Sequence, residues 1–295
     1  LMKEIIFITT QGCRVKRKDN QIVAFQEKEK IASFPINRIE KLFVFGNVEI
    51  TTSAVSFLLS RNVDIFLLSQ TGKLKGVITT PLKSNYNNRL KQFRAYFSEK
   101  NLYIAKFFVE KKIYQIQKFT GQDLSNYLKM LKNADSYNQI LGIEGNVSAL
   151  FFDHFKEYLK DKDLGFEKRQ YNPPPDPVNA LLSLTYSIFY SFLFSAALSR
   201  GYDPYVGFLH RKRGTHAAFV SDVMEAFRVD LTKFVGILFN SRFITLEDFK
   251  QENNTFHLKP DSLKKFIRIY HKNFIQDKDY KKQIEKFFLE LEEVL

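Results

Sequence analysis

The sequence predicts an α+β protein with a small β-rich N-terminal domain over residues 1–84 and a larger all-helical domain over residues 85–295. Two observations predict this division. In the first eighty residues, short runs of β-branched and aromatic residues alternate with turn signals. From about Tyr86 onward, apolar residues recur at intervals of three and four, and Gly and Pro become rare. A hydrophobic content of 44% is ordinary for a folded globular protein.

Four apolar runs in the N-terminal part predict β-strands: EIIFITT, QIVAFQ, KLFVFG and VDIFLLS. The stretch KRKDN between the first two predicts a turn. SAVSFLLSRN begins with serine and ends with asparagine, which predicts a short helix. TGKLKGVITTP predicts a hairpin that ends at Pro81.

Helical spacing dominates the rest of the chain. It predicts helices at about 86–118, 122–132, 136–160, 216–230, 230–241, 260–273 and 280–294. The segment YNPPPDP is a rigid break, within which Asp176 is a candidate N-cap and Pro177 a first-turn proline.

Residues 178–198 carry no charge and are long enough to cross a bilayer. Small polar residues recur every four positions along them, which would let a neighbouring helix approach closely. The rest of the chain offers no second span. We therefore expect a helix buried on every face rather than a membrane span.

The net charge indicates which classes of partner the protein binds, and the cysteine count indicates which covalent and metal sites it lacks. Lys and Arg number 45 against 32 acids, which gives +13 and suits a polyanion, nucleic acid first and an anionic membrane surface second. The single cysteine, Cys13, excludes an intrachain disulfide and a cysteine-based zinc site. LMKEIIFITTQG has neither a long apolar stretch nor a small-residue cleavage site, so we expect no signal peptide and a cytoplasmic protein.

The stretch GFLHRKRGTHAAFVSDVMEAFR, residues 207–228, contains most of the candidate site residues. On a helix over 217–228, Asp222 and Glu225 fall together opposite an apolar stripe. They are either the water-facing side of that helix or two acids that share a divalent cation with His210. Mixed nitrogen and oxygen ligands suit Mn²⁺, and carboxylates with waters suit Mg²⁺. The cations beside the histidine are candidate phosphate contacts: Arg211, Lys212 and Arg213.

A third ligand is available in QILGIEGNVSALFFDHF, which reads as a helix. Gly142 and Gly145 bracket Glu144 there, although each glycine inside a helix costs about 1 kcal/mol relative to alanine. The pair indicates that another backbone or a ligand comes close, or that the helix start is frayed.

LGIEGNVSALFF, DPVNALLSLTYS and GYDPYVGFLH…SDVMEAFR resemble, in order and spacing, the signature stretches of the CRISPR-associated integrase family, the metal-dependent subunit of spacer acquisition. The resemblance implies a catalytic set in which Glu144, His210 and Glu225 hold Mg²⁺ or Mn²⁺. It implies that Asp222 orients a ligand or a metal-bound water. One departure is GTHAAFVSD after the histidine, where the family often has GRPSLALD.

Arg169 and Asn179 match further positions of the family pattern, which implies that they structure or line the site, with Arg169 as a candidate DNA contact. The resemblance also implies a homodimer built through the β-rich domain and a small ferredoxin-like partner subunit. The implied substrates are a double-stranded protospacer and the CRISPR repeat.

The implied reaction is attack of a protospacer 3′-hydroxyl on a repeat-end phosphodiester, with a metal ion polarising the phosphoryl oxygen. Two alternatives stay open. One is a metal-dependent nuclease that cleaves branched or single-stranded DNA, and the other is a non-catalytic DNA-binding assembly subunit. The sequence has no Gly-rich phosphate loop, so we expect no nucleotide cofactor.

Overall fold

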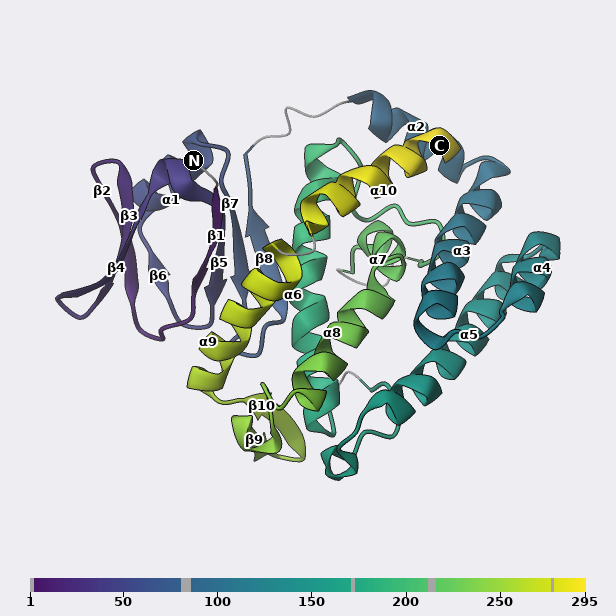
Figure 1. The fold of residues 1–295 in the computed structure, drawn as a ribbon. Helices are drawn as coiled ribbons and strands as arrows, with labels where there is room; N and C mark the ends of the chain where they lie inside the picture. Colours follow the sequence, from purple (N-terminus) through teal and green to yellow (C-terminus); the bar gives the residue numbers. More distant parts are fainter. Residues whose placement is uncertain (1–2, 81–85, 171–172, 212–215, 277–278) are drawn as a thin grey trace. The chain divides into compact units, whose positions relative to one another are not determined.

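The computed structural model describes residues 3–80, 86–170, 173–211, 216–276 and 279–295. The chain divides into two compact units (Figure 1). Unit 1 consists of Leu1–Lys83 and Leu258–Asn273, and unit 2 of Ser84–His257 and Phe274–Leu295. The first segment of unit 1 is built mainly of strands and unit 2 mainly of helices, so the predicted α+β class is confirmed.

Unit 1 contains two four-stranded sheets. In the first, the order is β1-β5-β7-β8, with β1, β5 and β7 parallel and β8 antiparallel to β7. Its strands are β1 (Glu4–Ile8), β5 (Ile39–Phe45), β7 (Asp64–Leu68) and β8 (Leu74–Ile78). The second sheet has the order β4-β3-β2-β6. Its strands are β2 (Arg14–Lys18), β3 (Gln21–Gln26), β4 (Glu29–Pro35) and β6 (Glu49–Ile50).

The two sheets share one apolar core with helix α1 (Thr52–Ser60). Buried side chains from all three meet there, among them Leu42, Ile22 and Leu58. The stretch KRKDN was expected to be a turn, but its first three residues belong to β2. The reversal is confined to the residues that follow, where Asp19 adopts a positive φ of 53°.

Helix α9 (Pro260–Ile269) packs with unit 1, although the sequence analysis placed residues 260–273 in the helical domain. Its buried residues include Leu263, Phe266 and Ile267, which lie on one face. Ile267 lines a cavity of about 260 Å³ together with residues of the first seventy, such as Phe7 and Phe34. Apolar spacing predicts that one face is buried, but it does not say which part of the chain covers it.

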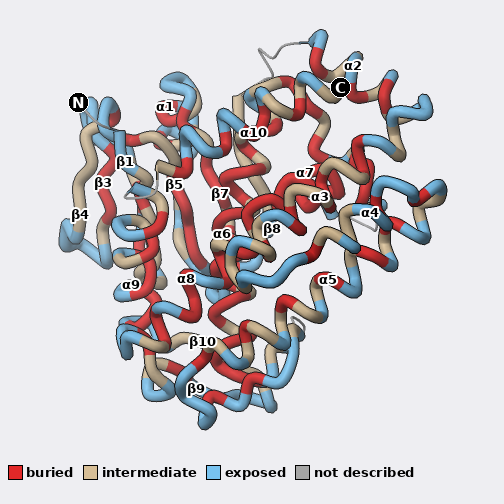
Figure 2. The backbone as a smooth tube through the Cα atoms, turned by 45° about the vertical axis from the view of Figure 1, so that its right-hand side comes forward, coloured by how far each residue is buried: buried red, intermediate tan, exposed pale blue. Residues whose placement is uncertain are grey.

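Unit 2 is a helical assembly with one small hairpin. Its elements are α2 (Tyr86–Tyr96), α3 (Lys100–Thr120), α4 (Ser125–Asn133), α5 (Tyr137–Tyr158), α6 (Pro177–Ser199), α7 (Ala218–Glu225), α8 (Arg228–Asn240), β9 (Phe249–Glu252), β10 (Thr255–Leu258) and α10 (Tyr280–Val294). Helix α3 packs against α4, α5 and α7, and α6 packs against α7 and α8. Helix α7 is therefore enclosed between α3 and α6, and Figure 2 shows it buried along its length.

The single helix expected over 86–118 is two helices, α2 and α3. At the break, the Ser98 hydroxyl accepts a hydrogen bond from the Lys100 amide (3.2 Å), and the Asn101 side chain donates to the Tyr96 carbonyl (2.8 Å). Such polar side chains satisfy backbone groups that would otherwise continue the helical ladder. The break makes α2 a separate element, which carries the buried polar residues Asn88 and Gln92.

Helix α6 begins as predicted. Asp176 accepts a hydrogen bond from the Asn179 amide (2.7 Å), and Pro177 occupies the first turn. Among the described residues, α6 is the one helix long and apolar enough to cross a membrane. However, 72% of its most apolar window is buried inside the protein, as in a core helix of a folded domain.

The glycines that bracket Glu144 lie on the exposed side of α5, and a Cβ added to either would meet no atom within 4 Å. The expected approach of another backbone is therefore wrong for the described residues.

We predict that Gly142→Ala and Gly145→Ala each stabilise the protein by about 1 kcal/mol, because alanine favours the helix and nothing obstructs the added methyl group. Urea unfolding measures the effect. Gly236→Ala is the matched control and should destabilise, since its Cβ would lie 2.8 Å from atoms of Phe155 and Tyr158. Destabilisation by Gly142→Ala or Gly145→Ala would contradict this description of α5.

Candidate functional site

Helix α7 is buried on every side. All eight of its residues are buried, and the exposed fraction is 0% for Asp222 and 1% for Glu225. The interpretation of these two acids as a water-facing side is therefore wrong. Because burying a carboxylate without a partner is costly, both must be paired.

Asp222 fixes the backbone that carries His210. Its Oδ2 accepts hydrogen bonds from the amides of Phe208 (2.5 Å) and Leu209 (3.1 Å), and its Oδ1 accepts from the amide of His210 (2.7 Å). The same Oδ1 lies 2.8 Å from His210 Nδ1. Burial raises the pKa of Asp222, and the hydrogen bonds from His210 and Phe208 oppose that shift. An ionised Asp222 engages Nδ1–H and leaves Nε2 as the ring nitrogen that can bind a ligand.

Two further residues hold this loop in place. A Cβ on Gly207 would lie 2.7 Å from the His210 carbonyl oxygen and 2.8 Å from Ala218, so only glycine allows the loop to pass this close to the start of α7. From α2, the Gln92 side chain donates to the carbonyls of Asp203 (3.0 Å) and Val206 (2.8 Å) and accepts from the Asp203 amide (2.8 Å). Sequence reasoning missed Gln92; the available signal was its spacing of three from Ala95, which is also buried.

Glu225 is the centre of a charge cluster. Its Oε1 accepts from Arg228 Nη2 (2.7 Å), and its Oε2 accepts from Lys112 Nζ (2.7 Å). His210 Nε2 lies 3.9 Å from Glu225 Oε1. Burial would raise the pKa of Glu225, but the charges of Arg228, Lys112 and His210 outweigh it and hold that pKa well below its usual range.

Lys112 joins Glu144 to this cluster. It comes from α3, its side chain is 2% exposed, and its Nζ contacts Glu144 Oε1 (2.5 Å) as well as Glu225. Glu144 Oε1 also accepts from the Ser148 hydroxyl (2.8 Å). Sequence reasoning missed Lys112, although the signal existed, because a lysine stands within a run of buried α3 positions: Ile104, Ala105, Phe108, Val109, Ile113 and Ile116.

The four predicted site residues therefore come together from α5, the loop before α7, and α7 itself. Burial alone would lower the pKa of His210, but its hydrogen bond to Asp222 and the charges of Asp222 and Glu225 raise it overall. Histidine and two glutamates offer the nitrogen and oxygen donors that Mn²⁺ and Mg²⁺ accept.

These donor types fit a divalent cation, and the bridging position of Lys112 Nζ demonstrates that Glu144 and Glu225 can face one cation together. Among the described residues, no three His, Cys, Asp or Glu side chains already form a group that could hold a metal ion. In this arrangement the two glutamates are paired with Lys112 and Arg228 instead.

Arg169 makes contacts within the protein. Its Nη1 donates to Asn179 Oδ1 (2.9 Å) and its Nη2 to the Ser183 hydroxyl (3.0 Å), while its guanidinium lies 5.3 Å from the ring centroid of Tyr186. Asn179 is fully buried and also donates to the Lys168 carbonyl (2.9 Å). These contacts tie the segment before α6 to α6 itself; a DNA contact by Arg169 stays a prediction.

The three cations after His210 are only partly described. The Arg211 guanidinium lies 4.6 Å from the ring centroid of Tyr137. Lys212 and Arg213 lie outside the described residues.

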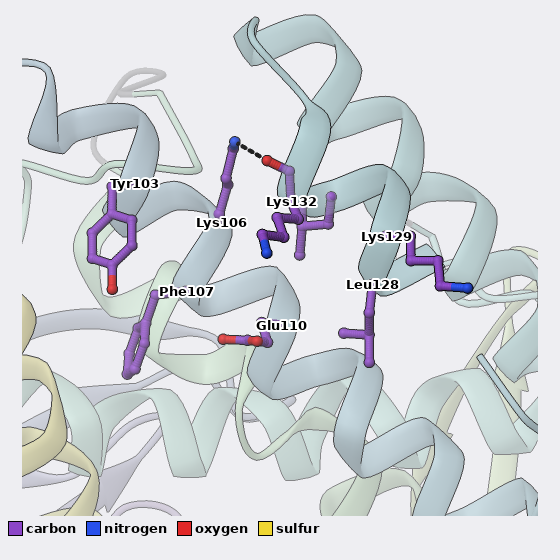
Figure 3. A pocket seen from close by; sticks show the side chains of 8 residues that line it. Tyr103, Lys106, Phe107, Glu110, Leu128, Lys129 and Lys132 are labelled. Atoms are coloured by element: carbon purple, nitrogen blue, oxygen red, sulfur yellow. Dashed lines mark hydrogen bonds between the residues drawn. The ribbon is translucent and has the colours of Figure 1, made fainter. Parts of the chain in front are cut away.

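A cavity of about 380 Å³ lies between α3 and α4, away from this cluster (Figure 3). Its lining residues are Tyr103, Lys106, Phe107, Glu110, Leu128, Lys129, Leu131 and Lys132. Glu110 faces the cavity, whereas Lys112, about 200° further round α3, faces the glutamates. Across the cavity, Lys106 Nζ donates to the Lys132 carbonyl (2.9 Å), so the walls are tied together.

We predict that Asp222→Asn lowers the free energy of unfolding by about 2–3 kcal/mol, because an amide cannot accept all of these hydrogen bonds and one buried donor would be left unpaired. Urea unfolding measures the loss, and ¹⁵N shifts of the His210 ring should show a mixed tautomer. Asp248→Asn is the control, since Asp248 accepts from the Thr245 amide in a more exposed turn. A loss below about 0.5 kcal/mol for Asp222→Asn would mean that the carboxylate does not anchor the loop.

Comparison with known proteins identifies the family of the chain. The family model described as CRISPR associated protein Cas1 matches residues 6–272. A CRISPR-associated endonuclease Cas1 of Thermodesulfovibrio yellowstonii is 29% identical over 287 residues, covering 90% of this chain and 89% of that protein. A Cas1 protein structure from Thermotoga maritima has a TM-score of 0.89 at 23% identity, covering 98% and 96%. A casposase bound to its integration product has a TM-score of 0.79 at 24% identity, covering 90% and 80%. The chain therefore belongs to the Cas1 family of CRISPR-associated proteins.

Proposed function

We propose that this chain is a metal-dependent DNA integrase and endonuclease of CRISPR adaptation. The observation that carries the proposal is the convergence of Glu144, His210 and Glu225, from three separate elements, on one charge cluster. Family membership supports the same reading, since a related protein is named an endonuclease and a structural neighbour holds an integration product.

Glu144, His210 through Nε2, and Glu225 are the residues that would hold Mg²⁺ or Mn²⁺. The ion, when bound, supplies a Lewis acid that polarises a phosphoryl oxygen. Asp222 keeps Nε2 directed away from its own carboxylate, because His210 Nδ1 is engaged with Asp222. Arg228 holds Glu225 through paired guanidinium contacts and so fixes the orientation of that carboxylate.

The proposed reaction is a transesterification. The oxygen of a protospacer 3′-hydroxyl forms a bond to a repeat phosphorus, one phosphodiester bond of the repeat breaks, and the proton passes to the departing oxygen or to solvent. One bond forms for each that breaks, so no nucleotide hydrolysis is required. With water as the nucleophile, the same site would hydrolyse DNA, which is the second candidate function and is favoured by the naming of a relative as an endonuclease.

Double-stranded DNA is the proposed substrate, and the net charge of +13 suits it. Arg211, Lys212 and Arg213 are proposed to hold phosphates beside the site. The homodimer, the small ferredoxin-like subunit and the cytoplasmic location stay predictions.

We predict that Glu144→Gln, His210→Asn and Glu225→Gln each reduce strand transfer by more than about 100-fold while DNA affinity stays near that of the wild type, because each removes one donor to the ion. A labelled protospacer duplex is incubated with a supercoiled plasmid that carries a repeat. Joining gives labelled plasmid, whereas hydrolysis gives nicked plasmid without label.

Glu167→Gln is the matched control, because Glu167 is an exposed acid whose one ion pair within the described residues is with Lys156. Chelation with EDTA should reproduce the effect of the site variants. Near-normal joining by the three site variants would favour the non-catalytic assembly subunit. Nicking without joining by the wild type, lost in the three site variants, would favour the nuclease.

A further inference from the structure

Lys112 occupies an unusual position for a lysine. Its neighbours along α3 on the same face include Phe108, Val109 and Ile113, each fully buried, and its own side chain is 2% exposed. A lysine on a helix normally packs its stem on apolar surface and keeps its ammonium in water. Here the ammonium instead ends between two carboxylates.

Those carboxylates belong to Glu144 and Glu225, which are also the proposed metal ligands. Lys112 Nζ lies 2.5 Å from Glu144 Oε1 and 2.7 Å from Glu225 Oε2. An ammonium is a compact point charge on a flexible stem, so it can bridge two oxygens without demanding a fixed coordination geometry. It thus occupies the space between the two carboxylates, where a shared divalent ion would have to lie.

The charge balance of the cluster makes the Lys112 ammonium and a divalent metal ion competitors for the same two carboxylates. The acids are Glu144, Asp222 and Glu225, and the fixed cations are Lys112 and Arg228, so with a neutral His210 the acids exceed the cations by one. A divalent ion added to this set would reverse the sign. It would also lie within a few ångströms of the ammonium at a buried position, where repulsion between cations is strong.

Of the two cationic side chains in the cluster, Arg228 is held by more contacts than Lys112. Its Nε and Nη2 both donate to Glu225, at 3.1 Å and 2.7 Å, and its guanidinium lies 5.1 Å from the ring centroid of Tyr186. The Lys112 ammonium, by contrast, contacts only the two carboxylates among the residues that the structure describes. Displacement of a cation therefore falls to Lys112.

We propose that Lys112 is a tethered cation that closes the site between Glu144 and Glu225, and that a divalent ion binds by displacing it. This inference rests on the proposed metal site. It gives Lys112 two effects: it neutralises two carboxylates that would otherwise repel each other, and it lowers the affinity of the site for the ion.

The test compares Mn²⁺ binding to the full-length wild type, Lys112→Met and Lys111→Met by isothermal titration calorimetry. Methionine keeps the stem and removes the charge. Lys111 is the matched control, because it is the adjacent residue on α3 and pairs with Glu290 at 2.6 Å, outside the cluster. Lys112→Met should bind Mn²⁺ about tenfold more tightly or better, and Lys111→Met within about twofold of the wild type.

A second readout is the melting temperature. In EDTA, Lys112→Met should melt below the wild type, because two buried carboxylates lose a partner, and Mn²⁺ should restore more of its stability than it adds to the wild type. Equal or weaker Mn²⁺ binding by folded Lys112→Met would overturn the inference and leave the metal site standing. Failure of the wild type and both variants to bind Mn²⁺ would overturn the proposed metal site itself.

Amine labelling of the wild type covers the case in which Lys112→Met does not fold. The protein is acetylated briefly with and without saturating Mn²⁺, and labelling of each lysine is read by peptide mass spectrometry. Mn²⁺ should raise the labelling of Lys112 at least about threefold and leave Lys111 unchanged, because the displaced ammonium is released from its carboxylates. Equal labelling of Lys112 in both conditions would overturn the displacement.

Discussion

The buried carboxylate of Glu225 is the group on which the arrangement of the helical unit depends. It is 1% exposed, and its partners come from α3 through Lys112, from α8 through Arg228, and from the loop before α7 through His210. Lys112 extends the contacts to Glu144 on α5. An unpaired buried charge costs several kcal/mol, so none of these elements can shift without a large loss. The constraint that fixes the helices is thus the same one that gathers the candidate ligands.

The buried carboxylate of Asp222 fixes the loop that carries His210. Backbone amides have few ways to be satisfied where no regular ladder exists, and three consecutive ones here converge on one carboxylate. Asp222 thus anchors the loop from within the stretch that departs from the family pattern, and the Phe219 amide of the same stretch donates to the Pro204 carbonyl (3.0 Å). The same residues stabilise the fold and are proposed to carry the chemistry, and functional sites are commonly not optimised for stability.

Part of the fold and part of the candidate site could be predicted from the sequence. The change of period near Tyr86 gave the two-part α+β organisation, and Asp176 with Pro177 marked the start of α6, because both are local signals. Glu144, His210 and Glu225 came from the resemblance, and the structure brings them together. Helical spacing alone did not decide whether Asp222 and Glu225 face water or a shared cation. It shows that the two acids lie on the same side of the helix, but not what packs against that side. Local spacing indicates that Lys112 and Gln92 lie on buried faces of their helices, but their partners, like the placement of α9, depend on contacts between segments far apart in the chain.

A double-mutant cycle on Lys112 and Glu225 tests the central claim most directly. Urea unfolding without metal would be measured for the wild type, Lys112→Met, Glu225→Gln and the double variant. We expect the double variant to lose less stability than the sum of the two single losses, by about 1–3 kcal/mol, because each single change leaves a buried charge unpaired and the double change removes both charges. Losses that add within about 0.5 kcal/mol would contradict it and would mean that the two side chains are independent in solution.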